Sequence, residues 1–288
     1  MSRWLVTGAG GMLGRDVVAA LCGRGAVVVA LTRGDLDVTD RAAVRAAVGC
    51  YRPDVVVNCA AWTDVDGAER DEAAALAVNG HGARNVAVAC AEHRARLVQV
   101  STDYVFAGDL GLPYREDARP EPRTSYGRTK LAGEQAALAE LPGASLVLRT
   151  AWLYGGAGPS FVHTMIKLAS QRPVVEVVAD QRGQPTWTAD VAEQMILLVT
   201  AGAHGIFHAT SSGETTWFEL AREVFALLGA DPARVRPTTS EAFGRPASRP
   251  ACSVLRHDRH VLAGVEPIGH WQTALRRAWP ALGAPLSS

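Results

Sequence analysis

Short runs of apolar residues recur along the first half of the chain, separated by longer stretches in which apolar residues return every three or four positions. Residues 3–7, 26–31 and 54–58 are such runs, and residues 96–101 and 145–149 continue the series. Continuous runs rich in β-branched side chains suit strands that are buried on both faces of a parallel sheet. The pattern predicts five parallel strands, with those at 26–31 and 54–58 buried on both faces.

Helical periodicity occupies the intervals between these runs. Met12, Leu13, Val17 and Leu21 fall on one side of a predicted helix, and Asp40 is a candidate N-cap for the next one. Strands that alternate with helices indicate an α/β fold, with a doubly wound parallel sheet of the Rossmann type. Further helices are predicted at residues 41–48, 72–92 and 124–141.

The pattern loosens after residue 150, where prolines and short elements mix with predicted helices near 188–201 and 216–228. We expect residues 1–150 to form a dinucleotide-binding domain. Residues 151–288 should mainly form a smaller C-terminal substrate lobe, with some segments returning to the first domain. The site is then expected in the cleft between the two parts.

Composition narrows the classes of function. The 29 basic and 29 acidic residues give a formal net charge of zero, so composition implies no basic face for a nucleic acid. No apolar stretch approaches the ~18 residues that span a bilayer, and no signal peptide is recognisable, so we expect a cytoplasmic protein without a membrane partner. Five cysteines without a CxxC pair argue against a disulfide framework or a zinc site.

A glycine-rich turn follows the first predicted strand. Gly8, Gly11 and Gly14 have the spacing GxxGxxG between a strand and a helix. Glycines here permit a tight turn, close approach of the backbone to a pyrophosphate, and close packing of the helix on the strand. The N–H groups at the helix start then bind the negative charge. The expected cofactor contacts at this turn are Gly8, Gly10, Gly11, Met12, Leu13 and Gly14.

The residues after the second predicted strand bear on the choice of cofactor. Arg33 stands where an enzyme strict for NAD usually carries an acid that holds the ribose hydroxyls, and its guanidinium could receive a 2′-phosphate. Asp35 and Asp37 lie nearby and could compete for the same space. We expect NADPH to be preferred and NADH to be accepted as well, with Asp37 and Val38 also lining the cofactor site.

Tyr126 and Lys130 form a Tyr-x-x-x-Lys pair at the start of a predicted helix, so their side chains share one helical face. A tyrosine with a pKa of ~10 is a poor proton shuttle at neutral pH, and a neighbouring cation lowers that pKa. Lys130 is one of only two lysines in the chain. A third member is expected at the carboxyl end of a strand, where Ser101 or Thr102 could hydrogen-bond a substrate carbonyl.

Seven motifs in order resemble one family, the dTDP-4-dehydrorhamnose reductases, a branch of the extended short-chain dehydrogenases. The motifs are TGAGGMLG, NCAAWTDVDGAE, STDYVFAG, YGRTK, RTAWLYG, DQRGQPTWTADVA and RPACSVL. The resemblance implies a Rossmann domain with a smaller C-terminal lobe that binds a sugar nucleotide. It also implies reduction of the 4-keto group of a dTDP-4-dehydro-6-deoxy sugar, first of all dTDP-4-dehydrorhamnose to dTDP-rhamnose.

The resemblance also assigns roles to residues that match the family's motifs. It makes Thr102, Tyr126 and Lys130 the catalytic three. It places Asp103, Tyr104, Val105 and Trp152 in the sugar pocket, and Trp62 at a variable position that touches substrate. It places Ala60 and Ala61 beside the cofactor, and Asn79 near the catalytic lysine.

Some members of the family hold a magnesium ion at a homodimer contact made by acidic residues. Here Asp16 follows Gly14 and Arg15, and no full set of acids can be identified. Magnesium and a homodimer are therefore raised by the resemblance alone, and no metal ligand is assigned.

Four other functions are compatible with this fold, and the sequence fits them unequally. Sugar-nucleotide dehydratases carry Asp-Glu after the catalytic threonine, whereas Asp103 and Tyr104 follow Thr102 here. Sugar 4-epimerases fit STDYVF and RPACSVL less well. A reductase for an antibiotic-type deoxysugar, as in the dihydrostreptose branch, would carry the same motifs. A non-catalytic nucleotide-binding subunit, like the regulatory subunit of methionine adenosyltransferase, is disfavoured because Tyr126 and Lys130 are intact.

Overall fold

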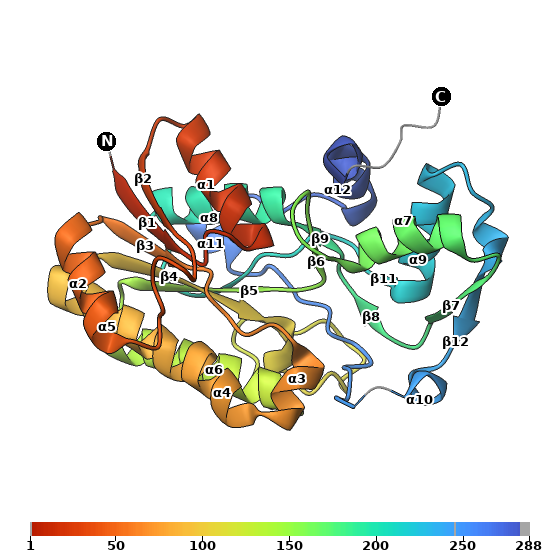
Figure 1. Cartoon of the computed structure of the whole chain (residues 1–288), viewed down its shortest axis with the longest axis horizontal. Coiled ribbons are helices and arrows are strands. Elements are labelled where there is room, and N and C mark those ends of the chain that lie inside the picture. The colour runs from red at the N-terminus through yellow and green to blue at the C-terminus, as the bar shows by residue number, and fades with distance from the viewer. Residues whose placement is uncertain (1, 245, 283–288) are drawn as a thin grey trace.

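The centre of the molecule is a six-stranded parallel sheet in the order β10-β5-β4-β3-β1-β2 (Figure 1). The computed structural model describes residues 2–244 and 246–282. Chain order reverses at β1, where β2 pairs on one side and β3 on the other, so a crevice is expected above this switch point. The strands are β1 (Arg3–Thr7), β2 (Val27–Leu31), β3 (Val55–Asn58), β4 (Arg96–Thr102), β5 (Ser145–Thr150) and β10 (Gly205–His208).

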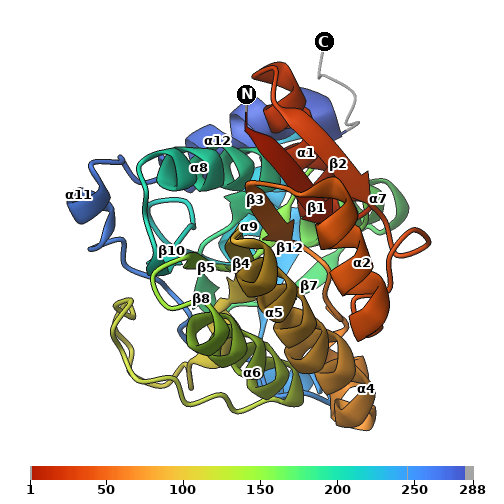
Figure 2. The same cartoon turned by 90° about the vertical axis from the view of Figure 1, so that its left-hand side faces the viewer.

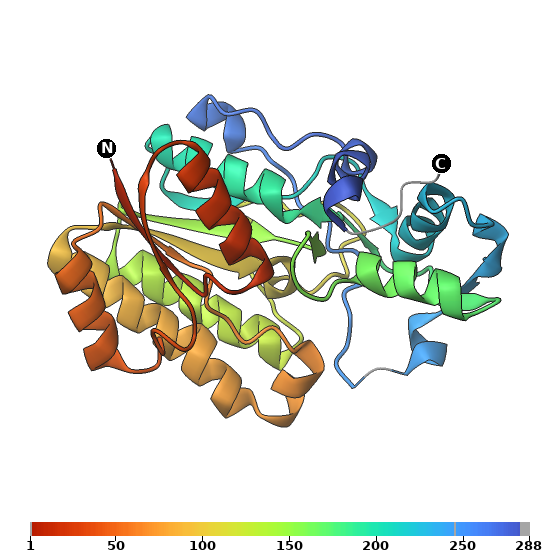
Figure 3. The ribbon, with the colours of Figure 1, turned by 45° about the horizontal axis from the view of Figure 1, so that its top comes forward.

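Helices cover both faces of this sheet, which confirms the doubly wound α/β fold. The helices α1 (Met12–Gly23) and α8 (Thr188–Thr200) pack side by side on one face (Figure 3). The other face carries α2 (Arg41–Tyr51), α5 (Ala83–His93) and α6 (Ser125–Glu140) (Figure 2). Asp40 caps α2 as predicted, since its carboxylate accepts hydrogen bonds from the backbone N–H groups of Ala42 and Ala43.

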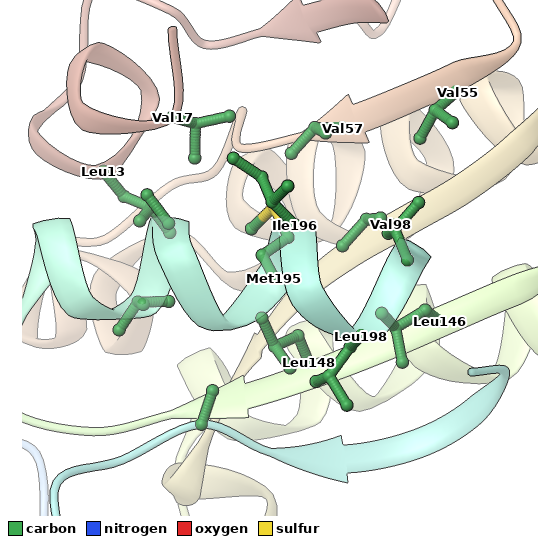
Figure 4. Packing of buried hydrophobic residues seen from close by; sticks show 14 of the residues in the cluster. Leu13, Val17, Val55, Val57, Val98, Leu146, Leu148, Met195, Ile196 and Leu198 are labelled. Carbon is green, nitrogen blue, oxygen red and sulfur yellow. The ribbon is translucent and has the colours of Figure 1, made fainter. Parts of the chain in front are cut away.

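Burial of aliphatic side chains holds α1 and α8 to the sheet. Figure 4 shows Leu13 and Val17 of α1 and Met195 of α8 against the strand residues Val57 and Leu148. All five side chains are at most 7% exposed. Because α8 follows residue 150 yet packs here, this core is completed by the second half of the chain.

One prediction about a single element is wrong, and another is confirmed with an added feature. β2 was expected to be buried on both faces, but it is the edge strand and Val27 is 46% exposed. The helix predicted at 72–92 is continuous but not uniform. It begins as α4 (Glu72–Leu76), widens into the π-helix Ala77–Gly82 and continues as α5. Such π segments frequently lie at functional sites.

The elements after residue 150 divide between the sheet and a separate core. α8 and β10 join the sheet, whereas α7 (Phe161–Gln171), β7 (Val175–Val178), α9 (Trp217–Leu227), β12 (Val235–Thr238) and α12 (Trp271–Ala278) surround their own apolar cluster. β7 pairs with β12 in parallel.

Short elements connect these parts. They are β6 (Leu153–Tyr154), β8 (Arg182–Gly183), β9 (Thr186–Trp187), β11 (Thr215–Thr216), α3 (Val65–Arg70), α10 (Ser240–Phe243), α11 (His260–Ala263) and short 3-10 turns, among them Asp103–Val105 after β4. Among the described residues, no helix combines the length and apolar character that a membrane crossing requires.

Candidate active site at the carboxyl ends of the strands

The glycine turn brings β1, α1 and the segment after β3 into close contact. Gly8 has φ +63°, and a Cβ there would lie 2.6 Å from the backbone nitrogen of Ala60. A Cβ on Gly14 would lie 2.3 Å from the carbonyl oxygen of Gly8. Real Cβ atoms cannot approach backbone so closely, so both positions require glycine. The turn therefore lies directly beside Ala60, as a cofactor held by both segments would require.

The first turn of α1 is free to receive an anion. Its N-cap is Gly11, so no side chain accepts from the helix N–H groups, and no acidic residue lies in the first turn. Gly10 is not crowded by protein, since its Cβ would meet only the Thr32 side chain at 3.6 Å. Open space at Gly10 and uncapped N–H groups at Met12 and Leu13 fit the phosphates of a dinucleotide.

The segment after β2 contains Arg33 and two acids, Asp35 and Asp37, which hydrogen-bond to their own neighbours. Arg33 is exposed. The carboxylate of Asp35 accepts from N and Oγ1 of Thr32, at 2.9 and 2.6 Å. Asp37 likewise accepts from Thr39, at 2.9 and 2.8 Å. These bonds hold the pKa of both carboxyls below the usual range. Both acids thus accept hydrogen bonds locally, and the charge of Arg33 also lowers the pKa of Asp37, while the exposed guanidinium can still receive a phosphate.

Val38 differs from the other predicted cofactor residues. Its side chain is buried in the core beneath α5, and its carbonyl accepts a hydrogen bond from Asn85. A Cβ on Gly82 of the π-helix would lie 2.8 Å from Val38 Cγ2. The structure gives the Val38 side chain a packing role.

Tyr126 and Lys130 lie in the first turns of α6, which Thr124 caps by accepting from the N–H of Gly127 at 3.0 Å. Burial raises the pKa of Tyr126, and the nearby hydroxyl of Thr102 at the end of β4 opposes this shift. Lys130 is 3% exposed, and its Nζ donates to the carbonyl of Val100 at 2.7 Å. The structure therefore brings together the three residues predicted as catalytic.

Burial sets the charge properties of Lys130. Loss of water around the ammonium lowers the pKa of Lys130 to about 8, and the carboxylate of Glu134 opposes that shift. The neighbouring thiol of Cys59 is itself buried, which raises its pKa to about 12 and keeps it protonated. Lys130 lies one helical turn from Tyr126 as predicted, but the expected lowering of the tyrosine pKa is not found, because burial outweighs it and raises the pKa of Tyr126.

A tight contact between α6 and the turn after β4 positions Tyr104. A Cβ on Gly127 would lie 2.2 Å from the carbonyl oxygen of Tyr104, so only glycine allows this approach. The rings of Tyr104 and Tyr126 meet edge to face, with centroids 5.6 Å apart. Val105 is different, because its side chain is fully buried against Phe106 and Tyr114. The turn thus presents Tyr104, and not the Val105 side chain, toward Tyr126.

Asp103 is a buried carboxyl with an incomplete set of partners. One oxygen accepts from Thr102 Oγ1 at 2.9 Å, and the other has no hydrogen-bond partner. Burial raises the pKa of Asp103 to about 6, although the nearby hydroxyls of Ser253 and Thr102 oppose the shift. An unpartnered buried oxygen next to Thr102 suits a hydroxyl of a bound substrate.

Asn79 fixes the segment after β3 against α6. Its Oδ1 accepts from the N–H of Trp62 at 2.9 Å, and its Nδ2 donates to the Trp62 carbonyl and to Thr129 Oγ1, each at 3.1 Å. Asn79 belongs to the π-helix, which turns its side chain out of the regular ladder. Its amide therefore ties the loop of Ala60, Ala61 and Trp62 to Thr129, the residue before Lys130 on α6.

Trp152 occupies a strained position after β5. Its φ is +48°, a left-handed conformation that costs about 1–3 kcal/mol in a bulky residue. The Trp152 ring stacks on Trp217, with centroids 3.5 Å apart and planes 7° apart, and a Cβ on Gly183 would lie 2.3 Å from that ring. Trp217 and Gly183 were not predicted from the sequence, although Gly183 lies within the motif DQRGQPTWTADVA.

Sequence reasoning also missed a link between α3 and the RPACSVL segment. Arg249 donates to Asp66 through both terminal nitrogens, at 3.1 and 3.0 Å, and the N–H of Ala247 donates to the same carboxylate. This pair is largely buried. The ion pair anchors the RPACSVL segment, in which Ser253 lies near Asp103. The motif was recognisable, but its partner on α3 was not.

Two histidines near the C-terminus, His257 and His260, and the acid Asp16 have protein partners. The ring of His257 pairs with Thr210, and that of His260 lies between Gln194 and the carbonyl of His208. Asp16 accepts from the hydroxyl of Thr188 on α8. Within residues 2–244 and 246–282, no group of three or more His, Cys, Asp or Glu residues could hold a metal ion.

Comparison with known proteins agrees with this geometry. The model of the RmlD substrate binding domain family matches residues 2–282. A dTDP-4-dehydrorhamnose reductase of Streptomyces griseus is 58% identical over 97% of this chain and 94% of its own length. A dTDP-4-keto-6-deoxy-D-glucose reductase of Streptomyces niveus is 55% identical over 98% of both chains.

Comparison with solved structures also identifies dTDP-4-dehydrorhamnose reductases. A dTDP-4-dehydrorhamnose reductase of Bacillus anthracis in complex with NADP is 38% identical and superposes with a TM-score of 0.94, over 97% of this chain and 99% of that one. The family inferred from the seven sequence motifs is thus confirmed over nearly the whole chain. This protein belongs to the dTDP-4-dehydrorhamnose reductase family of the extended short-chain dehydrogenases.

Proposed function

We propose that this protein uses NADPH to reduce the 4-keto group of a dTDP-4-dehydro-6-deoxy sugar, with dTDP-4-dehydrorhamnose as the first candidate. The observation that carries the proposal is the convergence of three groups: the Thr102 hydroxyl at the end of β4, the Tyr126 hydroxyl near it, and the buried ammonium of Lys130 on the same face of α6 as Tyr126. This group lies at the carboxyl end of β4, the edge of the sheet where α/β proteins bind ligands. The names of the relatives support the substrate class.

The chain's own residues supply binding and proton transfer in this proposal. NADPH, when bound, supplies the hydride that adds to the carbonyl carbon. The hydroxyls of Thr102 and Tyr126 donate hydrogen bonds to the ketone oxygen, and the Tyr126 proton moves to that oxygen as the alcohol forms. Lys130 stabilises the negative charge left on the tyrosine oxygen. One hydride and one proton convert the ketone into a secondary alcohol, so the step balances.

Cofactor placement follows from the reversal of strand order at β1, between β2 and β3. The pyrophosphate would meet the N–H groups of the first turn of α1, and Ala60 and Ala61 would form the opposite wall. Arg33 would receive the 2′-phosphate, because Asp35 and Asp37 are occupied by Thr32 and Thr39. We therefore propose a preference for NADPH with measurable use of NADH.

The sugar would lie between the catalytic tyrosine and the C-terminal lobe. Asp103 offers a buried oxygen without a partner, and Tyr104 lies against Tyr126. Trp152 adds an aromatic face, and Trp62 would contact the sugar from the segment after β3. This set suits a deoxysugar, which presents both hydroxyls and an apolar methyl group. The proposal assigns no metal ligand.

The decisive test is product identification. Purified protein is incubated with NADPH and, in separate reactions, a panel of dTDP-4-keto sugars, and products are identified by NMR. We expect dTDP-rhamnose from dTDP-4-dehydrorhamnose. Preference for another 4-keto sugar of the panel would assign the protein to an antibiotic-type deoxysugar instead. NADPH binding without turnover on any member would contradict the proposal and indicate a non-catalytic nucleotide-binding protein.

A further inference from the structure

A fully buried ion pair lies beneath the candidate active site. Arg149 of β5 donates to Glu134 of α6 through Nε at 2.9 Å and through Nη2 at 2.7 Å. Both side chains are 1% exposed. The guanidinium also lies 4.9 Å from the centroid of the Phe106 ring. This is a rigid bidentate arrangement, and it holds the Glu134 carboxylate in one place.

Stability alone does not explain such a pair. Removing two charges from water is costly, and apolar residues of similar volume often stabilise a protein equally well or better. Arg149 even leaves its Nη1 without a hydrogen-bond partner. A buried charge retained under these conditions is better explained by what it does to a neighbouring group.

The neighbouring group is Lys130. Glu134 follows it by four residues on α6, so the two side chains lie on one face of the helix, one turn apart. Both oxygens of Glu134 are engaged by Arg149, whereas Nζ of Lys130 donates to the Val100 carbonyl. The carboxylate therefore acts on the ammonium through its charge and leaves the Lys130 side chain extended toward the end of β4.

Other titratable groups cannot replace this carboxylate. The Cys59 thiol and the Tyr126 hydroxyl stay protonated because burial raises the pKa of each. His208 lies beside Arg149 on β10 and stays neutral, because burial and Arg149 hold its pKa well below the usual range. Of the influences on Lys130, burial lowers its pKa most strongly and Glu134 opposes it most strongly. The titratable groups around the ion pair and the active site are Cys59 after β3, Asp103 and Tyr104 after β4, Tyr126 on α6, Arg149 on β5 and His208 on β10.

We propose that Glu134, clamped by Arg149, is a positioning residue for the reduction, because its charge keeps the buried Lys130 amine protonated at neutral pH and directed toward the end of β4. The inference rests on the proposed function for the role of Lys130. The charge state itself is a property of the protein alone and can be measured without substrate.

The chain offers a direct measurement of that charge state. It contains only two lysines, Lys130 and the exposed Lys167. Protein labelled with ¹³C-lysine should therefore show two lysine Cε signals, and Lys167→Arg identifies which is which. We expect the Lys130 signal to titrate with a midpoint near its pKa of about 8. In Glu134→Leu/Arg149→Met, which replaces the ion pair by apolar side chains, the midpoint should fall by about one pH unit.

A matched control removes another ion pair from the same helix. Arg84→Met/Glu140→Leu deletes the exposed pair between α5 and the end of α6, ten residues, or ~15 Å, along the helix from Lys130. It should leave the Lys130 midpoint unchanged. Glu134→Gln serves as the isosteric second variant if the double variant does not fold. A Lys130 midpoint that is unchanged or raised without Glu134 would overturn the inference.

The pH dependence of kcat/KM supplies the functional readout. Activity that needs the ammonium is lost as pH rises through the Lys130 pKa. The Glu134→Leu/Arg149→Met variant should match the wild type near pH 6 and be about tenfold less active near pH 9. Coincident pH profiles would show that the pair is purely structural. If the wild type lacks reductase activity but the midpoint still falls, the proposed function is wrong and the electrostatic coupling stands.

Discussion

Gly183→Ala tests whether the stacked position of Trp152 matters for the sugar. The added Cβ would lie 2.3, 2.5 and 2.6 Å from Cε2, Cζ2 and Nε1 of the indole. Ordinary contacts between carbon atoms are ~3.5–4.0 Å, so a gap of about 1 Å must open. The indole has little room to turn aside. Its centroid lies 3.5 Å from that of the stacked Trp217 ring, and the centroids of Trp217 and Phe161 lie 4.5 Å apart.

We expect the ring of Trp152 to move as a whole, together with the backbone that holds its left-handed φ. Overpacking of this kind costs about 1–3 kcal/mol of stability. A displacement of ~1 Å at a substrate-positioning group can reduce the rate by ~10²-fold. Affinity for NADPH should stay unchanged, because the glycine turn after β1 is not involved.

The assay compares kcat/KM for the keto sugar with the dissociation constant for NADPH, measured by fluorescence. Gly23→Ala is the matched control, since a Cβ there meets nothing within 4 Å and the φ is not left-handed. It should retain full activity. A Gly183→Ala protein with normal kcat/KM, or one whose NADPH affinity falls as much as its kcat/KM, would refute the role given to Trp152.

The remaining predictions concern the tyrosine, the lysine and the cofactor. Tyr126→Phe removes only the hydroxyl and should lower kcat by ~10²–10⁴-fold. The control Tyr51→Phe, at the exposed end of α2, should have no effect, and a near-normal kcat for Tyr126→Phe would contradict the assignment. Lys130→Arg should lose most activity because a planar guanidinium cannot replace the buried ammonium that donates to Val100, and steady-state kinetics with full activity would contradict this. Arg33→Ala should raise KM for NADPH about ten- to a hundredfold and leave that for NADH nearly unchanged; equal responses of the two KM values would show that Arg33 does not hold the 2′-phosphate.

Local sequence determined much of this protein. The β-branched runs and the intervening helical periodicity identified five of the six sheet strands and the doubly wound class, because both patterns follow from which side chains a parallel sheet buries. The glycine turn and the Tyr126–Lys130 pair were recognisable for a related reason. Each depends on spacing within one short segment, such as the helical turn that puts Tyr126 and Lys130 on one face.

Contacts between distant segments were decided only by the tertiary structure. Nothing in residues 27–31 reveals that β2 is an edge strand, because that depends on where other strands pair. The π-helix around Asn79 likewise arises where the chain must meet Trp62 and Thr129 at once.

The residues that pack against the candidate site were also decided only by the tertiary structure. Trp217 behind Trp152 and Arg149 behind Glu134 lie far apart in sequence from the residues they hold, and no local periodicity links them. Burial is the physical reason. The unpartnered oxygen of Asp103 and the lowered pKa of Lys130 arise only when elements from distant parts of the chain pack around these groups and exclude water.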